Sequence, residues 1–505
     1  MTDTNQATET RTLHHWIGDA ALSGGVGTAD VFDPARGEPT AKVPLAGEAE
    51  VGAAVEAASN AFESWRESSL STRTEILFRF RELVAARSDE LARAVVREHG
   101  KVLSDARGEV RRGLDVIEYA CGIPQLLKGS FSENVSTDVD CVSIHQPLGV
   151  VAGITPFNFP VMVPMWKYPI AIACGNTFVL KPSEKDPSSA QLVAEWWAEA
   201  GLPAGVFNVV HGAREAVEAL LAHPDVRAIS FVGSTPVARH VHRTATEAGK
   251  RVQALGGAKN HMVVMPDADL DEAADAAVSA GYGSAGERCM AVSVIVAVGG
   301  VGDELVDRIR ARIARLRVGD GMDDPDMGPL VTREHRDRVA SYLDEGAEEG
   351  ARVVVDGRGL VVDGRPEGFF LGPCLLDDVR PEMTVYRDEI FGPVLGVVRV
   401  ASFDAARDLI NANPYANGVA VFTRDGAVAR RFQHEIEVGM VGINVPIPVP
   451  MAYYSFGGWR NSLFGDSRIY GEAGVRFYTR TKVVTSRWRP PAAGGTANLS
   501  FPTGD

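Results

Sequence analysis

The sequence lacks the features that mark several large classes of protein. Its 505 residues carry a formal net charge of -15, whereas a nucleic-acid-binding protein normally has a basic face. An acidic chain also gains nothing from an anionic membrane surface. No run approaches the roughly 20 apolar residues of a membrane-spanning helix, and the polar start does not resemble a secretion signal. We therefore expect no nucleic-acid partner and no membrane association.

Cysteine is scarce, and the spacing of the cysteines indicates neither disulfides nor a metal site. The five cysteines are Cys121, Cys141, Cys174, Cys289 and Cys374. An odd number at wide spacings suggests neither a disulfide framework nor a Cys-x-x-Cys metal site. The eleven histidines also have no metal-ligand spacing, so we expect no metal and assign no role to any of them. A reducing, cytoplasmic compartment is the default expectation.

Alternating apolar runs and helical segments indicate an α/β protein. The short apolar runs in the first half are Val150 to Ile154, Thr177 to Leu180, Val206 to Val210 and Ala228 to Val232. Helical patterns such as 188–200 and 236–248 separate them, which predicts a parallel sheet. A second alternating region runs from about 260 to 445. Because a chain of 505 residues is too long to fold around a single hydrophobic core, we expect two or three domains.

Helices are expected between the first strands and this sheet. Apolar residues recur every three or four positions from Val51 to Trp65, which predicts an amphipathic helix. Thr72 and Glu75 have the spacing of a capping box at the start of a second helix. Gly100 is expected to end a third.

Two glycine-containing stretches are candidate phosphate loops. Gly281 to Gly286 matches G-x-G-x-x-G, but the preceding segment has a helical pattern, whereas the fingerprint must follow a strand. We expect these glycines to allow a tight turn before Cys289 instead. Gly233 and Ser234 follow an apolar strand and open a helix, whose free N–H groups suit a pyrophosphate. Such a turn is common, so a purely structural role stays open.

Lys181 and Glu184 stand just past the end of another predicted strand. Ligands of open parallel sheets bind at that edge, so this pair could hold ribose hydroxyls. The alternative is a solvated surface pair. Asn158 lies between Pro156 and Pro160, which restrict the backbone. Its amide could stabilise an oxyanion, or it could satisfy its own turn.

Cys289 is the candidate nucleophile. It follows the glycine-rich turn and is preceded by Arg288, whose guanidinium is expected to lower the pKa of the thiol and favour the thiolate. The alternative is a small buried apolar residue, which is the usual setting of a free cysteine. The other four cysteines lack this setting and are interpreted as structural.

Taken together, six motifs occur in one order along the chain. They are Pro156 to Pro160, Leu180 to Glu184, Phe231 to Ser234, Leu255 to Gly257, Gly286 to Cys289 and Glu389 to Val394. This arrangement resembles the aldehyde dehydrogenase superfamily from about residue 12 to about residue 488.

The resemblance implies a role for each matching residue. It implies Cys289 as nucleophile and Asn158 as the side-chain oxyanion donor. NAD is the implied cofactor, and NAD rather than NADP fits the carboxylate of Glu184. The residues implied to bind it are Thr155, Phe157, Lys181, Glu184, Gly233, Ser234, Glu389 and Phe391.

The chain departs from the hydrolytic members of that superfamily. Those members carry a glutamate directly before Leu-Gly-Gly, which activates the water that cleaves the thioester. Here Ala254 occupies that position, or Leu255 if the alignment is made on Lys259. A second glutamate of many hydrolytic relatives is replaced by Ile469. Losing a general base costs hydrolysis roughly 10²–10⁴-fold, whereas a thiol such as CoA needs less help.

Acyl transfer to CoA is therefore the expected second half-reaction. The strings around Lys259, around Cys289 and from Phe477 to Arg480 are similar to acylating methylmalonate-semialdehyde dehydrogenases. That resemblance implies that Arg288 and an arginine on an earlier helix, Arg112 or else Arg111, hold the substrate carboxylate. A structural salt bridge is the alternative for each.

The expected products are acetyl-CoA or propionyl-CoA, from malonate or methylmalonate semialdehyde. The sequence does not separate these substrates, because one methyl group is worth only about 1–3 kcal/mol of discrimination. The competing hypothesis is a hydrolytic, NAD-dependent enzyme that releases a free acid.

The resemblance also predicts the architecture. Residues 12–128 and 149–259 are expected to form a Rossmann-type NAD-binding domain, and residues 260–450 an α/β catalytic domain. Residues 129–148 and 481–489 are expected to form a small β arm that joins subunits into a homodimer or homotetramer. Residues 490–505 are expected to be a disordered tail.

Overall fold

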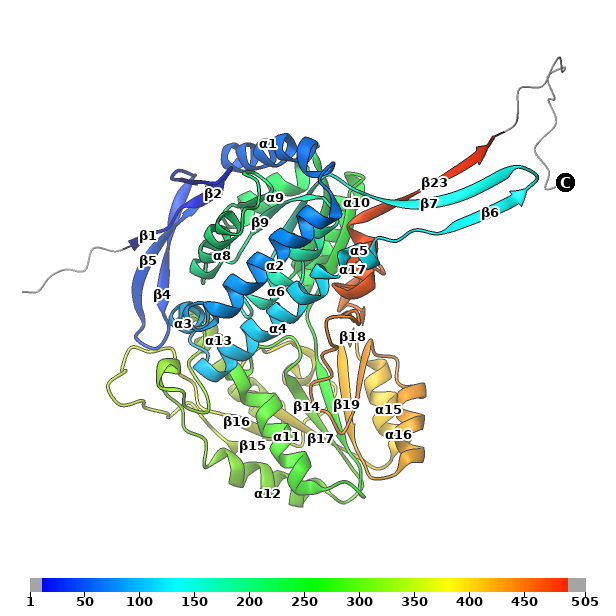
Figure 1. The fold of residues 1–505 in the computed structure, drawn as a ribbon. Coiled ribbons are helices and arrows are strands. Elements are labelled where there is room, and N and C mark those ends of the chain that lie inside the picture. Colours follow the sequence, from blue (N-terminus) through cyan, green and yellow to red (C-terminus); the bar gives the residue numbers. More distant parts are fainter. Residues whose placement is uncertain (1–10, 489–505) are drawn as a thin grey trace, which may run out of the picture.

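The computed structural model describes residues 11–488 and contains two mixed α/β sheets, as the sequence predicts. Figure 1 shows these two parts stacked, with a long β arm projecting from the first. The predicted tail, 490–505, lies outside the described residues. The division into domains stays a prediction, although the two sheets do lie in the two predicted regions.

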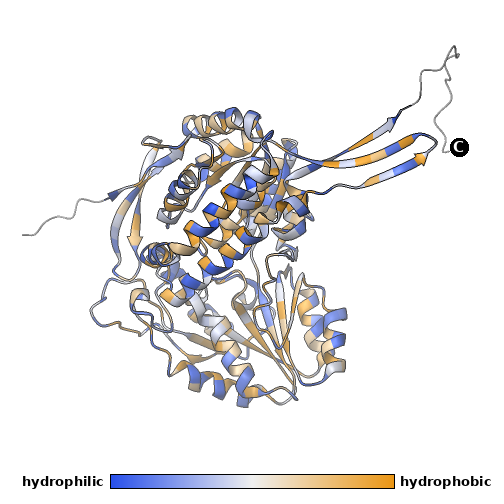
Figure 2. Ribbon diagram, in the orientation of Figure 1, coloured by the Kyte–Doolittle hydropathy of each residue, from blue (hydrophilic) through white to orange (hydrophobic). Residues whose placement is uncertain are grey.

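The first sheet has eight strands with a parallel centre. Its order is β22-β12-β11-β8-β9-β10-β2-β3. In that order the strands are Leu463–Phe464, Arg251–Leu255, Val226–Val232, Val150–Ile154, Thr177–Lys181, Phe207–Val209, His15–Ile17 and Ala20–Leu22. The four predicted apolar runs are its central strands, and all of β8 and β9 is buried. The hydropathy colouring of Figure 2 shows apolar residues concentrated on the inner strands and on the inner faces of helices.

Helices cover both faces of this sheet and create two separate cores. One core contains residues of α1, α9 and α10, which span Glu48–Trp65, Arg214–Ala222 and Thr235–Glu247. The other contains residues of α2, α4, α7 and α8, which span Leu70–Ala86, Leu103–Cys121, Tyr168–Ala173 and Ser188–Glu199. Side chains of one strand alternate between these cores, which decides the orientation of several site residues.

The helix boundaries confirm two predictions and correct a third. The apolar stripe from Val51 to Trp65 lies on α1. Gly100 ends α3 (Ser88–His99) with φ 88°, a conformation that favours glycine. The capping box predicted at Thr72 is wrong, because α2 begins earlier. Ser69 is the N-cap and accepts a hydrogen bond from the Thr72 N–H at 3.1 Å, so Thr72 already lies in the first turn.

The second sheet has seven strands, all parallel except at one edge. Its order is β15-β16-β17-β14-β13-β19-β20. In that order the strands are Arg352–Val355, Cys374–Asp377, Val394–Val400, Val292–Val298, Asn260–Val264, Gly418–Phe422 and Met440–Ile443. The helices of this part are α11 (Leu270–Tyr282), α12 (Gly302–Ile313), α13 (Arg333–Glu348), α14 (Thr384–Arg387), α15 (Phe403–Ala412) and α16 (Gly426–Glu435).

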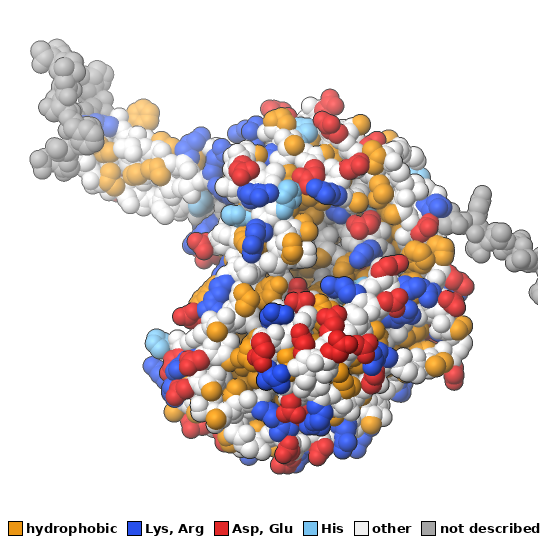
Figure 3. Space-filling model, turned by 180° about the vertical axis from the view of Figure 1, so that it is seen from behind, with side chains coloured by type: hydrophobic (Ala, Val, Ile, Leu, Met, Phe, Trp, Pro, Cys, Tyr) orange, Lys and Arg blue, Asp and Glu red, His pale blue; other side chains and the backbone are white. Residues whose placement is uncertain are grey.

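The projecting arm is a three-stranded antiparallel sheet. It consists of β6 (Phe131–Ser136), β7 (Val139–Pro147) and β23 (Thr479–Arg487), in the order β23-β7-β6. These strands come from the segments predicted to form it. A smaller sheet near the start of the chain combines β1 (Arg11–Thr12), β5 (Glu38–Leu45) and β4 (Gly27–Asp33). Charged side chains of both signs cover the body, whereas hydrophobic side chains follow the arm (Figure 3).

Candidate active site

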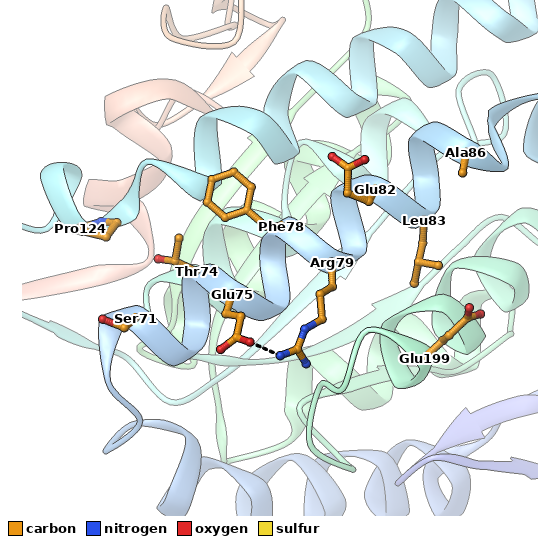
Figure 4. A pocket seen from close by; sticks show the side chains of 10 residues that line it. All are labelled: Ser71, Thr74, Glu75, Phe78, Arg79, Glu82, Leu83, Ala86, Pro124 and Glu199. Carbon is orange, nitrogen blue, oxygen red and sulfur yellow. Dashed lines mark hydrogen bonds and ion pairs between the residues drawn. The ribbon is translucent and has the colours of Figure 1, made fainter.

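Two cavities of similar size differ in their chemistry. The first, of about 970 Å³, lies along the outer face of α2 and is shown in Figure 4. Phe78 and Leu83 line it, and its one internal ion pair joins Glu75 to Arg79. No thiol reaches it. The second, of about 670 Å³, is lined by both Cys289 and Asn158, so we place the candidate site there.

The second cavity lies at the carboxyl ends of parallel strands. Residues 156–158 follow β8, residues 232–236 follow β11, and Gly256 and Gly257 follow β12. The other wall comes from α13 and from residues 388–391 beside the second sheet. Ligands of open parallel sheets bind at this edge. Five of the six motifs thus meet at one cavity, whereas the motif Leu180 to Glu184 does not line it.

A strained turn presents Cys289 to the cavity. α11 ends at Tyr282, which confirms that the G-x-G-x-x-G match follows a helix and not a strand. Ser284, Ala285 and Gly286 then adopt φ values of 54°, 52° and 73° in succession. Only Gly286 of the three glycines needs a positive φ. A Cβ there would also lie 2.3 Å from the carbonyl oxygen of Gly392, so the glycine allows the two segments to approach.

Two buried amides hold the Cys289 backbone. The Asn260 Nδ2 donates to the carbonyl oxygen of Cys289 at 3.0 Å, and the Asn417 Nδ2 donates to the same oxygen at 3.2 Å. Asn260 also donates to the carbonyl of Ala291 and accepts from the N–H of Gly418. These residues were not assigned a role from the sequence. Asn260 belongs to the Gly-Ala-Lys-Asn-His string, which was the available signal.

The thiol itself is not activated in the way that the sequence predicts. Burial, together with the Glu389 carboxylate, raises the pKa of Cys289 to about 12, although backbone N–H groups and Arg288 act in the opposite direction. Arg288 therefore does not dominate, because desolvation of the thiolate outweighs one partly screened guanidinium. Without ligand, Cys289 is a thiol at neutral pH.

Arg288 is paired with a carboxylate in this structure. Its Nη2 donates to the Oδ1 of Asp105 at 2.5 Å, and both side chains are largely buried. A Cβ on Gly283 would lie 2.5 Å from Nη1 of Arg288, so this glycine leaves room for the guanidinium. The salt bridge that the sequence left as an alternative is present. A role of Arg288 in substrate binding stays a prediction. Asp105 would then influence that binding through its ion pair with Arg288.

Asn158 lines the same cavity as Cys289, and its role as an oxyanion donor stays a prediction. Its side-chain amide has no hydrogen-bond partner among residues 11–488, and the residue lines the cavity with Cys289. Its carbonyl accepts a hydrogen bond from the buried Lys101 Nζ at 2.7 Å, and Lys101 also pairs with Glu109 at 2.6 Å. This buried ion pair fixes the backbone that carries the amide. Lys101 was not assigned a role from the sequence.

An aromatic pair borders the predicted nicotinamide region. Phe157 and Phe391 meet edge to face with centroids 5.8 Å apart. Phe391 has φ 59°, and His335 donates from Nε2 to its carbonyl oxygen at 2.7 Å. Burial lowers the pKa of His335 to about 4, so this ring is neutral. His335 therefore supports the backbone of Phe391 in the site, a role that the sequence did not predict.

Glu389 lies between the two sheets. Its Oε1 accepts from the N–H of Ala258 at 2.8 Å, and a Cβ on Gly257 would clash with the carboxylate at 2.1 Å. Burial raises the pKa of Glu389 to about 7, while the Ala258 N–H and Lys259 lower it. The carboxylate is thus poised near neutral pH, in the cavity that Cys289 also lines.

The proposed pyrophosphate turn has the expected geometry. Gly233 and Ser234 connect β11 to α10, whose first helical residue is Thr235, and all three line the cavity. The Thr235 Oγ1 accepts from the N–H of Gly257 at 2.9 Å, which ties this turn to the next strand end. The start of α10 therefore opens on the cavity, as anion binding requires.

The ribose pair lies less directly on the cavity. Lys181 and Glu184 are not among its lining residues, whereas Lys185 is, with its Nζ 4.5 Å from the Phe157 ring centroid. Lys181 is buried, donates from Nζ to the Gly212 carbonyl at 2.8 Å, and lies 3.5 Å from Glu184. Thr155 is buried, and its hydroxyl has no partner within the described chain. The roles of these residues stay predictions.

The alternation of β12 decides which residue replaces the missing glutamate. Ala254 packs into the core formed with α9 and α10. Leu255 faces the opposite way, into the core against which Cys289 packs, and Ile469 lies in that same core. Of the two alternatives for the glutamate position, this geometry favours Leu255. Successive side chains of a strand point to opposite faces, and only one face is shared with the nucleophile.

The structure also distinguishes the two arginines of α4. Arg111 is 62% exposed and pairs with Asp115 and Glu118 on the outer side of the helix. Arg112 also lies 3.6 Å from Asp115, but it donates from Nη2 to the Pro450 carbonyl at 2.8 Å and approaches the Met451 sulfur. Of the two, only Arg112 contacts residues 449–451, where Val449 packs against the same core as Cys289.

Comparison with known proteins agrees with this geometry. A model of the aldehyde dehydrogenase family matches residues 22–484. The chain belongs to the aldehyde dehydrogenase family. It is 55% identical to a malonate-semialdehyde dehydrogenase of Pseudomonas aeruginosa, over 97% of this chain and 99% of that one. It is 50% identical to malonate-semialdehyde dehydrogenase 3 of Geobacillus kaustophilus, over 95% of this chain and 100% of that one.

Solved structures place this aldehyde dehydrogenase among the same relatives. A methylmalonate-semialdehyde dehydrogenase of Oceanimonas doudoroffii superposes with a TM-score of 0.94 at 53% identity, over 96% of this chain and 99% of that one. A Sinorhizobium meliloti protein assigned the same activity, complexed with NAD, superposes with a TM-score of 0.95 at 50% identity and the same coverage.

The remaining cysteines take no part in the site. All five are free, and Cys121, Cys174 and Cys374 are buried in the hydrophobic cores. Across residues 11–488, no group of three or more His, Cys, Asp or Glu side chains could hold a metal ion. No helix in that range is long and apolar enough to cross a membrane.

Proposed function

We propose that this NAD-dependent aldehyde dehydrogenase oxidises malonate semialdehyde or its methyl derivative and transfers the decarboxylated acyl group to CoA. The relatives named above support the substrate class. The observation that carries the proposal is that Leu255, and not a carboxylate, faces the core beside Cys289. Water attacking a thioester needs a base, whereas a thiol nucleophile is already partly ionised.

The cavity fits a dinucleotide in its charge and shape. The start of α10 offers N–H groups for phosphate at Gly233 and Ser234, and Glu389 is available for ribose hydroxyls. Phe157 and Phe391 offer apolar faces to a nicotinamide ring. When bound there, NAD accepts the hydride from the aldehyde carbon.

In the first half-reaction, the Cys289 thiol gives its proton to water, and the resulting thiolate sulfur attacks the aldehyde carbonyl carbon. The Asn158 side-chain amide, which has no partner within residues 11–488, and the backbone N–H of Cys289 stabilise the oxygen that becomes negatively charged. Departure of the hydride leaves an acyl thioester on Cys289. Because burial opposes the thiolate, binding of a cationic ring near Cys289 is expected to promote this step.

Two arginines are proposed to hold the substrate carboxylate. Arg112 contacts Pro450, which follows Val449 of the core that Cys289 packs against, and Arg288 directly precedes Cys289 in sequence. A guanidinium matches a carboxylate through two parallel hydrogen bonds. In the acyl thioester, the bond between this carboxylate and the α carbon breaks and releases carbon dioxide, and the α carbon takes up a proton.

In the second half-reaction, the CoA thiolate attacks the thioester carbonyl and Cys289 leaves as a thiolate. The products are acetyl-CoA from malonate semialdehyde or propionyl-CoA from its methyl derivative. CoA is thus a co-substrate, and no residue of its site is assigned.

Hydrolysis is the second candidate, because Glu389 offers a base. Its pKa of about 7, raised by burial, suits general-base catalysis, and it lies close enough to Cys289 to raise the pKa of that thiol. If Glu389 activated water, the product would be a free acid and CoA would be unnecessary.

One measurement separates the two. We would follow NADH formation from malonate semialdehyde and NAD, with and without CoA, and identify the product by mass spectrometry. Multiple turnovers only with CoA, yielding acetyl-CoA, support the acylating function. Equal turnover without CoA, yielding a free acid, would overturn it. In that case, loss of hydrolysis in Glu389→Gln with a retained NADH burst would identify the base.

The arm is proposed to join subunits into a homodimer or homotetramer. Phe131, Val135, Val483 and Trp488 expose 65%, 50%, 62% and 84% of their surface on or beside it. A row of apolar side chains on an isolated three-stranded sheet is unfavourable in water unless a partner covers it. A cytoplasmic location stays the expectation from cysteine usage alone.

A further inference from the structure

Tyr470 occupies a strained and buried position near the site. It precedes α17 (Gly471–Phe477), is 2% exposed, and has φ 45°. A tyrosine in this region of backbone space costs free energy, which persists only where surrounding contacts hold it. Those contacts include the rings of Trp166 and Phe456, with centroids 5.2 and 6.3 Å away.

The hydroxyl of Tyr470 shares an acceptor with Arg112. It donates to the carbonyl oxygen of Pro450 at 3.1 Å, and Arg112 Nη2 donates to the same oxygen at 2.8 Å. A carbonyl oxygen has two lone pairs and can accept both bonds. Arg112 has two weaker partners besides Pro450, the Val449 carbonyl at 3.4 Å and the Asp115 carboxylate at 3.6 Å. Pro450 is therefore held between a rigid phenol and a flexible guanidinium.

Tyr470 also belongs to the hydrophobic core against which the nucleophile packs. Cys289 packs against the apolar core that contains Tyr470, Trp166 and Phe456. Burial raises the pKa of the Tyr470 hydroxyl, the Arg112 charge lowers it, and the Cys289 charge raises it. Arg112 and Cys289 therefore both lie close enough to the Tyr470 hydroxyl to affect it electrostatically.

We propose that Tyr470 is a positioning residue that sets the preference of this enzyme for a carboxylate-bearing aldehyde. Through the Pro450 carbonyl it fixes Arg112 so that less side-chain freedom is lost when the substrate carboxylate binds. The inference rests on the proposed function, because it takes Arg112 as a ligand of that carboxylate. The residue it adds, Tyr470, does not itself contact the substrate carboxylate.

The substitution Tyr470→Phe tests this with a minimal change. It removes only the hydroxyl and keeps the ring that packs on Trp166. The matched control is Tyr168→Phe, because the Tyr168 hydroxyl is equally buried and has no hydrogen-bond partner among residues 11–488. Steady-state kinetics would compare malonate semialdehyde with propanal, which has the same carbon chain length but no carboxylate, in the presence of NAD and CoA.

The expected result is a change in KM confined to the charged substrate. Loss of one such hydrogen bond corresponds to roughly a 2- to 10-fold effect. Tyr470→Phe should raise the KM for malonate semialdehyde by about that factor, with kcat and the kinetics of propanal unchanged. Tyr168→Phe should change neither substrate. In an Arg112→Met background, Tyr470→Phe should have no further effect on KM.

Two results would overturn the inference, and they differ in meaning. If Arg112→Met raises the KM for malonate semialdehyde but Tyr470→Phe does not, or affects both aldehydes equally, Tyr470 has no positioning role and the proposed function stands. If Arg112→Met leaves the preference for the charged aldehyde intact, the assignment of Arg112 fails and the inference fails with it.

Discussion

Replacing Leu255 by glutamate should convert a CoA-dependent enzyme into one that also hydrolyses its thioester. Leu255 is 2% exposed and packs in the core that Cys289 touches. A carboxylate there is desolvated, so its pKa is raised, as burial raises that of Glu389 to about 7. A carboxylate of that basicity is suited to accept a proton from water near neutral pH.

The size of the effect follows from the role of a general base. Such a base contributes roughly 10²–10⁴-fold, so we expect CoA-independent turnover to rise at least ~100-fold in Leu255→Glu. Because the carboxylate acts only when ionised, this activity should increase as the pH rises through its pKa. The substitution also exchanges a buried apolar side chain for a polar one, which should cost about 2–5 kcal/mol of folding free energy.

The assay needs a control for volume and polarity without basicity. Leu255→Gln has the same shape as the glutamate variant and cannot accept the proton. NADH formation without CoA and the mass of the acid product would be measured for both variants, with an NADH burst to verify acylation. If Leu255→Glu acylates Cys289 but still turns over only with CoA, the missing base does not explain the CoA dependence.

Three further outcomes follow from the site. Cys289→Ala should abolish NADH formation while NAD binding, measured by calorimetry, is retained; persistent turnover would refute the thioester. Because burial raises the pKa of Cys289 to about 12, alkylation of the NAD-free enzyme should accelerate about tenfold per pH unit from 7 to 9, and a flat profile would contradict this. Asp105→Asn, which removes the charge paired with Arg288 at 2.5 Å, should raise the KM for malonate semialdehyde about 3- to 10-fold. An equal loss with propanal would instead indicate a structural role.

Local patterns in the sequence were sufficient to predict many of the strands and helices and most of the reactive residues. The run Val150–Ile154 is a buried strand, and Gly100 ends a helix, because strand burial and helix termination depend on a few neighbouring residues. The ordered motifs also indicated Cys289 and Asn158, since each motif is contiguous and its chemistry depends on residue type. Both residues line one cavity in the structure.

Orientation across long sequence distances was decided only by the tertiary structure. The sequence left Ala254 and Leu255 as alternatives, and the position of β12 between two cores places Leu255 on the side of Cys289. The pairing of Arg288 with Asp105 joins residues 183 positions apart, which no local pattern encodes.

The burial of the Cys289 thiol also depends on segments that are far apart in the sequence. Arg288 beside Cys289 predicted a lowered pKa, but the surrounding fold removes water from the thiol and raises its pKa instead. The sequence by itself determined which chemical groups this aldehyde dehydrogenase has and the strands and helices that carry them. The tertiary structure alone decided which of those groups face one another and how much water they keep, because facing and desolvation depend on segments brought together only by folding.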